Sequence, residues 1–252
     1  MITTLLITIL IITIFCEFID ASIGMMYGTI LTPVLLILGY SVIDIVPAIL
    51  LSQAIGGFIA SIRHNQYGNI RIFKKSSTDL KIALTIFGFG ILGIILGVFL
   101  SLNIPKEYIK IYIGILVLIM GIIVLINKKF IFSWKKIYIL SILSSFNKAL
   151  SGGGFGPLMS TGLIVSGKES KSSIGITDMA EVPICLSAFI AWLILNNATL
   201  NMPLLIVLCI GASIGSFIGP YATYKLDNKI LKIIVGIVAV VLGIICIFGA
   251  KI

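Results

Sequence analysis

Three groups of polar residues lie inside long apolar stretches of this chain, and their types and spacing could do chemistry. The first group is Glu17, Asp20, Ser22, Gly24, Tyr27 and Gly28. The second group is Asn147, Lys148, Ser151, Gly152, Gly153, Gly154, Gly156 and Pro157. The third group is Ser52, Gln53, Asp178 and Glu181. Ionisable side chains are costly in apolar surroundings unless they face a cavity or a partner, so these groups hold the candidate binding residues.

The glycines of the first two groups interrupt apolar segments that otherwise have the composition of membrane helices. A break in a membrane helix frees backbone N–H groups, which lipid tolerates only where they line a cavity or bind a ligand. The helix after the break presents its positive N-terminal end, which suits an anion, and Pro157 fits an early helical position. We therefore expect a small oxyanion between Gly24–Gly28 and Gly152–Gly156. The alternative is that these glycines serve only close helix packing.

The ionisable candidates have several open roles. Glu181 could carry a proton, bind a cation or make a structural hydrogen bond, whereas Gln53 cannot titrate. Lys148 could attract the anion, pair with Glu17 or Asp20, or extend to water. Proton coupling and sodium coupling are both left open by these residues.

The sequence predicts no catalytic, metal or cofactor site. His64 is the only histidine and begins a basic loop, where we expect a polar helix cap. The cysteines form no CxxC or Cys/His cluster, which excludes zinc and haem sites. They are expected to be packing residues: Cys16, Cys185, Cys209 and Cys246. HExxH, GxSxG and P-loop motifs are absent from the sequence, so an enzyme is not expected.

Composition places the chain in the bilayer. Of its 252 residues, 59% are hydrophobic and 11% are charged, against about 25% charged in soluble domains. Apolar runs long enough to be helices cover residues 2–22, 25–39, 44–62, 80–101, 108–126, 135–150, 155–166, 172–194, 201–222 and 229–250. Runs 25–39 and 155–166 are short and follow the glycine breaks, so each could be half of a re-entrant hairpin. The expected fold is an all-α polytopic membrane protein with eight to ten membrane segments.

The basic residues predict the orientation. They lie in short loops between apolar runs rather than along one polar face, which argues against nucleic-acid binding. Strict alternation puts 14 of them on one side: Arg63, Arg71, Lys74, Lys75, Lys81, Lys128, Lys129, Lys135, Lys136, Lys168, Lys171, Lys225, Lys229 and Lys232. Only Lys106, Lys110 and Lys251 fall on the other side. The rich side is expected to be cytoplasmic, with both termini outside a multi-pass plasma-membrane protein. The apolar start has no basic n-region, so it is expected to be a membrane helix rather than a cleaved leader.

The chain also carries an internal repeat. A shift of 128 residues aligns Gly24 with Gly152, Gly28 with Gly156, Gly39 with Gly167 and Gln53 with Glu181. A shift of 122 residues aligns Gly93 with Gly215, Gly97 with Gly219, Gly114 with Gly236 and Gly121 with Gly243. Two halves, 1–127 and 128–252, are therefore expected, and an odd number of segments in each makes them inverted repeats. Inverted repeats with broken helices are typical of secondary transporters, whose solute site lies between the halves.

These motifs resemble a known family. Asp20–Gly28, followed by Pro33, Gly39 and Ser61–Asn69, is similar to the first-half signature of the sulfite exporter TauE/SafE family. Ser151–Pro157 and Gly175–Glu181 are similar to its second-half signature. The resemblance covers nearly the whole chain and implies a two-repeat permease for sulfur-containing anions such as sulfite, sulfoacetate or other organosulfonates. Two residues depart from the family pattern: Lys148 stands where an acidic residue is expected, and Gln53 where a glutamate is expected.

We therefore expect a secondary transporter that carries a small sulfur-containing anion. A passive anion channel and a non-transporting membrane scaffold or assembly protein are the alternatives, and a homodimer is left open. The expected substrate-binding residues are Asp20, Gly24, Tyr27, Gly28, Gln53, Asn147, Lys148, Ser151, Gly152, Gly153, Gly154, Gly156 and Glu181.

Overall fold

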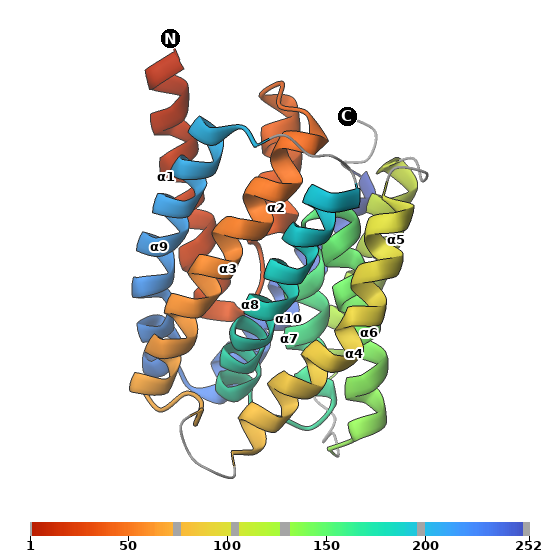
Figure 1. Ribbon diagram of the computed structural model, residues 1–252. Helices are drawn as coiled ribbons and strands as arrows, with labels where there is room; N and C mark the ends of the chain where they lie inside the picture. The colour runs from red at the N-terminus through yellow and green to blue at the C-terminus, as the bar shows by residue number, and fades with distance from the viewer. Residues whose placement is uncertain (1, 73–76, 102–105, 127–131, 196–199, 249–252) are drawn as a thin grey trace.

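The described part of the chain is a bundle of ten helices without a strand (Figure 1). The computed structural model describes residues 2–72, 77–101, 106–126, 132–195 and 200–248. The helices are α1 (Ile2–Ile23), α2 (Tyr27–Ile37), α3 (Val42–Gln66), α4 (Thr78–Leu100), α5 (Lys106–Leu125), α6 (Trp134–Ser151), α7 (Phe155–Val165), α8 (Ser170–Leu195), α9 (Met202–Lys225) and α10 (Asn228–Phe248). Each coincides within a few residues with a predicted apolar run. The prediction of an all-α polytopic membrane protein is confirmed.

Most of these helices have the length and the apolar surface of membrane-spanning helices. Six of them are long and apolar enough to cross a membrane: α1, α3, α4, α8, α9 and α10. Large apolar side chains on their outer faces are more than half exposed: Phe15, Phe58, Leu92, Ile194 and Phe217. A surface that faces water rarely carries so many exposed apolar side chains, whereas a surface that faces the hydrocarbon of a membrane requires them.

Helices α2 and α7 are half-length. Each has 11 residues, which at 1.5 Å per residue is about 16 Å, roughly half of a bilayer's hydrocarbon core. Neither can cross the membrane alone. Runs 25–39 and 155–166 are therefore half-helices that follow the glycine breaks, which settles the ambiguity left by the sequence.

Polar side chains fix where several long helices begin. The Ser41 hydroxyl accepts a hydrogen bond from the Asp44 N–H at the start of α3, 3.3 Å away. The Ser77 hydroxyl accepts from the Leu80 N–H at the start of α4. The Asn201 side-chain oxygen accepts from the Leu204 N–H at the start of α9. These caps satisfy N–H groups that have no partner within their own helix.

The two halves are alike in helix length and in packing. The five helices of the first half have 22, 11, 25, 23 and 20 residues, and those of the second half have 18, 11, 26, 24 and 21. Helix α1 packs on α9 as α6 packs on α4, and α3 packs on α8 at the centre. This correspondence supports the predicted repeat.

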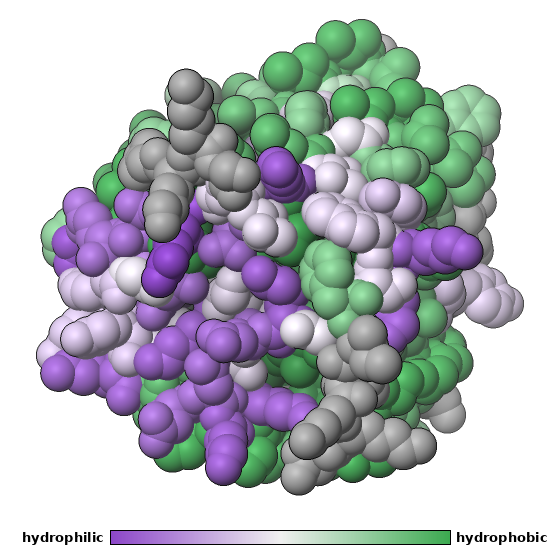
Figure 2. All heavy atoms as spheres, turned by 90° about the horizontal axis from the view of Figure 1, so that it is seen from below, coloured by the Kyte–Doolittle hydropathy of each residue, from purple (hydrophilic) through white to green (hydrophobic). Residues whose placement is uncertain are grey.

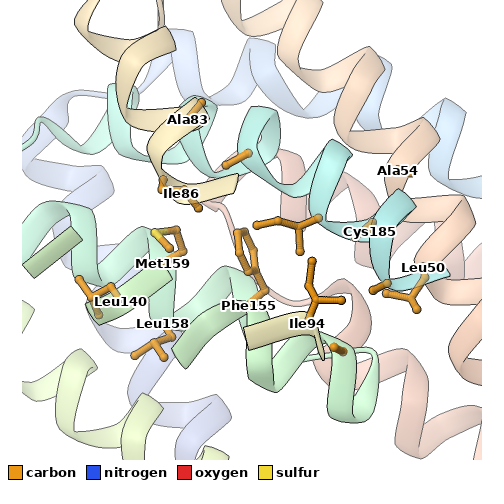
Figure 3. Close-up of a cluster of buried hydrophobic side chains, with 14 of the residues drawn as sticks. Leu50, Ala54, Ala83, Ile86, Ile94, Leu140, Phe155, Leu158, Met159 and Cys185 are labelled. Atoms are coloured by element: carbon orange, nitrogen blue, oxygen red, sulfur yellow. The ribbon is translucent and has the colours of Figure 1, made fainter. Parts of the chain in front are cut away.

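A buried apolar cluster holds the second half-helix in place (Figure 3). Phe155, the first residue of α7, is fully buried with Met159 one turn later. They belong to one cluster with Ile86 and Ile94 of α4 and Leu140 of α6. The start of α7 is therefore fixed by packing against long helices from both halves.

Apart from Lys148, which is buried inside the bundle, the basic residues with described side chains gather at one end of the bundle, the lower end in Figure 1. This end carries the C-termini of α3 and α9 and the N-termini of α4, α6, α8 and α10, and hydrophilic side chains cover much of it when it is viewed from below (Figure 2). The basic residues there are Arg63, Arg71, Lys81, Lys135, Lys136, Lys168, Lys171, Lys225, Lys229 and Lys232. Outside the described residues lie Lys74, Lys75, Lys128, Lys129 and Lys251, together with the side chains of Pro33, Lys106, Lys110 and Cys246.

Candidate functional site

The two glycine breaks meet inside the bundle, backbone against backbone. A methyl group on Gly28 would overlap the carbonyl oxygen of Gly152. A Cβ on Gly153 would lie 2.9 Å from the carbonyl carbon of Gly28, and one on Gly156 would lie 2.6 Å from the carbonyl oxygen of Gly24. Only glycine permits this approach, which explains its repeated use here. The breaks lie together as predicted, but their direct contact leaves no room for a solute between Gly28 and Gly152 in this conformation.

The backbone of both breaks adopts conformations that most residues avoid. Gly24, Gly152 and Gly154 have φ of 76°, 74° and 78°. Met26, just before α2, has φ of 135° although it is not a glycine. Glycine adopts these angles without strain, whereas Met26 is strained, and strained residues concentrate at functional sites.

Hydroxyl groups join the two breaks across the interface between the halves. Thr32 Oγ1 donates to the Ser151 carbonyl oxygen at 3.3 Å, and Thr29 Oγ1 accepts from the Gly154 N–H at 3.3 Å. Ser160 Oγ donates to the Gly24 carbonyl oxygen at 2.8 Å. These three hydrogen bonds tie the breaks of the two halves to each other.

A second feature is a buried polar cluster beside the breaks, centred on Lys148. The Lys148 ammonium lies 2.7 Å from Glu181 Oε1 and donates to Gln53 Oε1. Lys148 and Glu181 are 1% and 2% exposed. Positions 53 and 181, matched by the repeat, thus meet around one lysine. The lysine does not extend to water, and its ion-pair partner is Glu181 rather than Glu17 or Asp20, the partners considered from the sequence.

Asp20 connects this cluster to the first half-helix. Its Oδ1 accepts from the Tyr27 N–H at 2.9 Å, at the first residue of α2. Its Oδ2 accepts from Gln53 Nε2 at 3.3 Å. The Tyr27 phenol contacts the Ser52 hydroxyl at 2.7 Å. Asp20 therefore occupies the helix N-terminus that the sequence analysis assigned to a solute anion.

His64 is part of the buried network and not a surface cap. It is fully buried, with Nε2 3.0 Å from Asp178 Oδ2 and 3.0 Å from the Ala21 carbonyl oxygen. Asn69 Nδ2 contacts His64 Nδ1 at 2.9 Å and donates to the Pro220 carbonyl oxygen at 3.0 Å. Because the Asn69 amide nitrogen is a donor, His64 Nδ1 accepts and the ring proton sits on Nε2, facing Asp178. The prediction of a polar cap was wrong, because the end of α3 is covered by α8 and α9.

Four carboxylates and one ammonium are thus buried together. Glu17 accepts from the Ser216 hydroxyl at 2.6 Å through Oε1, whereas its Oε2 has no hydrogen-bond partner among the described residues. Oxygens of Asp20, Asp178 and Glu181 lie within 4.8 Å of one another. A net negative charge at membrane depth is costly. The cluster is therefore the candidate functional site of the bundle.

The remaining predicted residues lie next to this centre. Asn147 is fully buried, and neither atom of its amide has a partner among the described residues. Ser151 hydrogen-bonds the Asn147 carbonyl oxygen at 3.0 Å at the end of α6. Two contacts were missed from the sequence: Ser216, which reaches Glu17 from α9, and Asn69, which lies in the loop after α3 and contacts His64. Cys16 and Cys185 are buried, as expected for packing residues.

The comparisons with known proteins agree with this picture. The model of the family described as "Sulfite exporter TauE/SafE" matches residues 9–245. The chain is 27% identical over 236 residues to "Probable membrane transporter protein YtnM" of Bacillus subtilis (strain 168), covering 87% of this chain and 75% of that protein. No solved structure matches. The chain belongs to the sulfite exporter TauE/SafE family, a family of membrane transporters.

Proposed function

We propose that this TauE/SafE protein is a secondary transporter for a small sulfur-containing anion such as sulfite, sulfoacetate or another organosulfonate. The observation that carries the proposal is the meeting of two broken helices, one from each half, beside a buried polar cluster. Lipid does not tolerate exposed breaks, so a broken membrane helix must be buried in protein or line a pathway. The family's description names sulfite, and this supports the choice of solute class.

The chemistry of the site suits an oxyanion. The half-helices α2 and α7 begin at the breaks, so their positive N-terminal ends lie in the bundle interior. The Lys148 ammonium adds a full positive charge next to them. Together these groups would bind the anion, with Asn147 and Ser151 as further hydrogen-bonding groups beside it.

Transport requires the two breaks to separate. In the structure the Gly28–Gly152 contact closes the route between the halves. The bonds that hold it shut are a few hydroxyl–backbone contacts and glycine packing. Rocking of one half against the other would open a space between the breaks, as in other inverted-repeat carriers. The end of the bundle with the basic residues faces the cytoplasm in this proposal.

The test is solute flux in proteoliposomes. Labelled sulfite and organosulfonates are followed in wild type, Gly153→Leu and Glu181→Ala, with Gly88→Leu as the matched control because Gly88 faces open space on α4. Flux should saturate with solute and should fall to background in the first two variants only. Unchanged flux in both variants removes these residues from the pathway. Flux that never saturates favours the passive anion channel, and absence of flux with every anion favours a scaffold.

A further inference from the structure

The donors that a solute anion would use are already occupied by the chain's own acceptors. Asp20 accepts from the Tyr27 N–H at the start of α2. Lys148 is shared by Glu181 and Gln53. An anion can take these donors only if the internal acceptors give them up. Asp20 and Glu181 would therefore compete with a solute anion for these donors.

Charge makes this competition unfavourable while the carboxylates are ionised. Asp20, Asp178 and Glu181 have oxygens within 4.8 Å of one another, and all three are at most 4% exposed. Adding an anion to these charges in a low-dielectric interior would be strongly repulsive. Neutralising Asp20 or Glu181 removes one negative charge and weakens that residue's hold on its donor. Both effects favour anion binding.

We propose that Asp20 and Glu181 each take up a proton from the aqueous side when the anion binds, so that the protein carries protons and anion in the same direction. This proposal rests on the function proposed above, and it names the proton as the ion that is coupled to transport. The proton attaches to a carboxylate oxygen, and no other bond is made or broken. After the anion is released, both carboxylates lose their protons to the side of the membrane that received the anion. Asp20 then accepts again from the Tyr27 N–H, and Glu181 accepts again from Lys148.

The surroundings select a proton over a metal cation. Asp20, Asp178 and Glu181 offer a metal cation three carboxylate oxygens, and the cation would need further oxygen ligands to complete its shell. The groups that reach the carboxylates are instead donors: the Tyr27 N–H, Gln53 Nε2, His64 Nε2 and the Lys148 ammonium. The Lys148 ammonium is itself a cation 2.7 Å from Glu181, and it would repel a second one.

Asp20 and Glu181 belong to one buried cluster of charged groups. The groups that act on Asp20 are Cys16 and Glu17 on α1 itself, Lys148 from α6, and Asp178, Glu181 and Cys185 from α8. Helix α3 contributes His64, which faces Asp178, and α2 contributes Tyr27, whose N–H reaches Asp20. Glu181 lies near Glu17, Asp20, Asp178 and Cys185 and makes the direct contact with Lys148.

The test measures protons and solute together on the purified protein. Methanesulfonate and isethionate are the probes because neither takes up a proton near neutral pH. Binding is followed by calorimetry, and proton uptake by an indicator dye in weak buffer, with choline or sodium as the counter-ion. Wild type should take up protons on binding, in either salt, and its affinity should fall by up to about tenfold per pH unit for each linked proton as the pH rises.

Variants identify the residues. Asp20→Asn and Glu181→Gln mimic the neutral form, so each should bind the probe with reduced proton uptake and a weaker dependence on pH. Asp227→Asn and Glu169→Gln remove exposed carboxylates and should behave as wild type. Binding by wild type without proton uptake, or binding that requires sodium, overturns this inference alone. Absence of binding to both sulfonates overturns it together with the proposed substrate class.

Discussion

Loss of the buried Lys148–Glu181 ion pair should be among the most damaging single changes in the protein. In Lys148→Met, the Glu181 carboxylate loses an ammonium 2.7 Å away while remaining 2% exposed. Removing one partner of a buried pair costs about 3–5 kcal/mol. In a chain of this length each kcal/mol lowers the melting temperature by about 2–4 °C. We therefore expect a fall of roughly 6–20 °C.

The assay is thermal unfolding in detergent of Lys148→Met, Glu181→Gln and the double variant. The double variant should lose less stability than the sum of the single variants, because removal of one partner already removes the interaction. Lowering the pH should reduce the loss in Lys148→Met, since a protonated Glu181 no longer needs the ammonium.

The chain provides its own control ion pair. Lys168 lies 2.9 Å from Asp79 at the end of the bundle, with side chains that are 18% and 14% exposed. Lys168→Met should cost only about 0–1 kcal/mol, as expected for a pair near water. The reasoning is refuted if Lys148→Met is no more harmful than Lys168→Met, or if the effects of the Lys148 and Glu181 substitutions simply add.

Three further predictions use the same unfolding assay or a labelling assay. Gly28→Ala should lower the melting temperature because its methyl group meets the Gly152 carbonyl oxygen, whereas Gly88→Ala, which meets open space, should leave it unchanged or raise it slightly; equal effects would contradict the contact. Asn69→Ala should cost about 1–3 kcal/mol, since it leaves a buried Pro220 carbonyl oxygen without its donor; an unchanged melting temperature would contradict this bond. Cys185 should resist maleimide in the folded protein and react after denaturation, as mass spectrometry would detect; rapid labelling of the folded protein would place it elsewhere.

The course of the chain could be predicted well from the sequence because lipid imposes simple rules. Lengths of apolar segments gave ten helices close to those observed, since a helix must satisfy its backbone within the bilayer. The glycines around Gly24 and Gly152 marked where helices break, because lipid tolerates such interruptions only in special places. The predicted repeat placed the two breaks opposite each other, but the sequence analysis expected a solute between them and not their direct contact.

The partners within the polar cluster could not be predicted in the same way. Lys148 had several carboxylates to choose from, and Glu181 was fixed as its partner only by the packing of α6 beside α8. His64 was misjudged because burial at the end of α3 depends on α8 and α9, more than 100 residues away in the chain. The capping of α2 by Asp20 depends on the sharp turn of the backbone through Gly24 and Met26. The solute-binding role of these residues stays a prediction.

The central claim is that the two breaks must separate for a solute to pass, and locking them together tests it most directly. In a variant with all four native cysteines replaced by alanine, Thr32→Cys and Ser151→Cys place two thiols where a side chain of one half reaches the backbone of the other. A short bis-methanethiosulfonate then links the breaks in proteoliposomes through one disulfide to each cysteine, and each single-cysteine variant serves as the control. The account predicts that flux of labelled sulfite or organosulfonate falls to background on linking and returns on reduction. Full flux through the linked protein would contradict it.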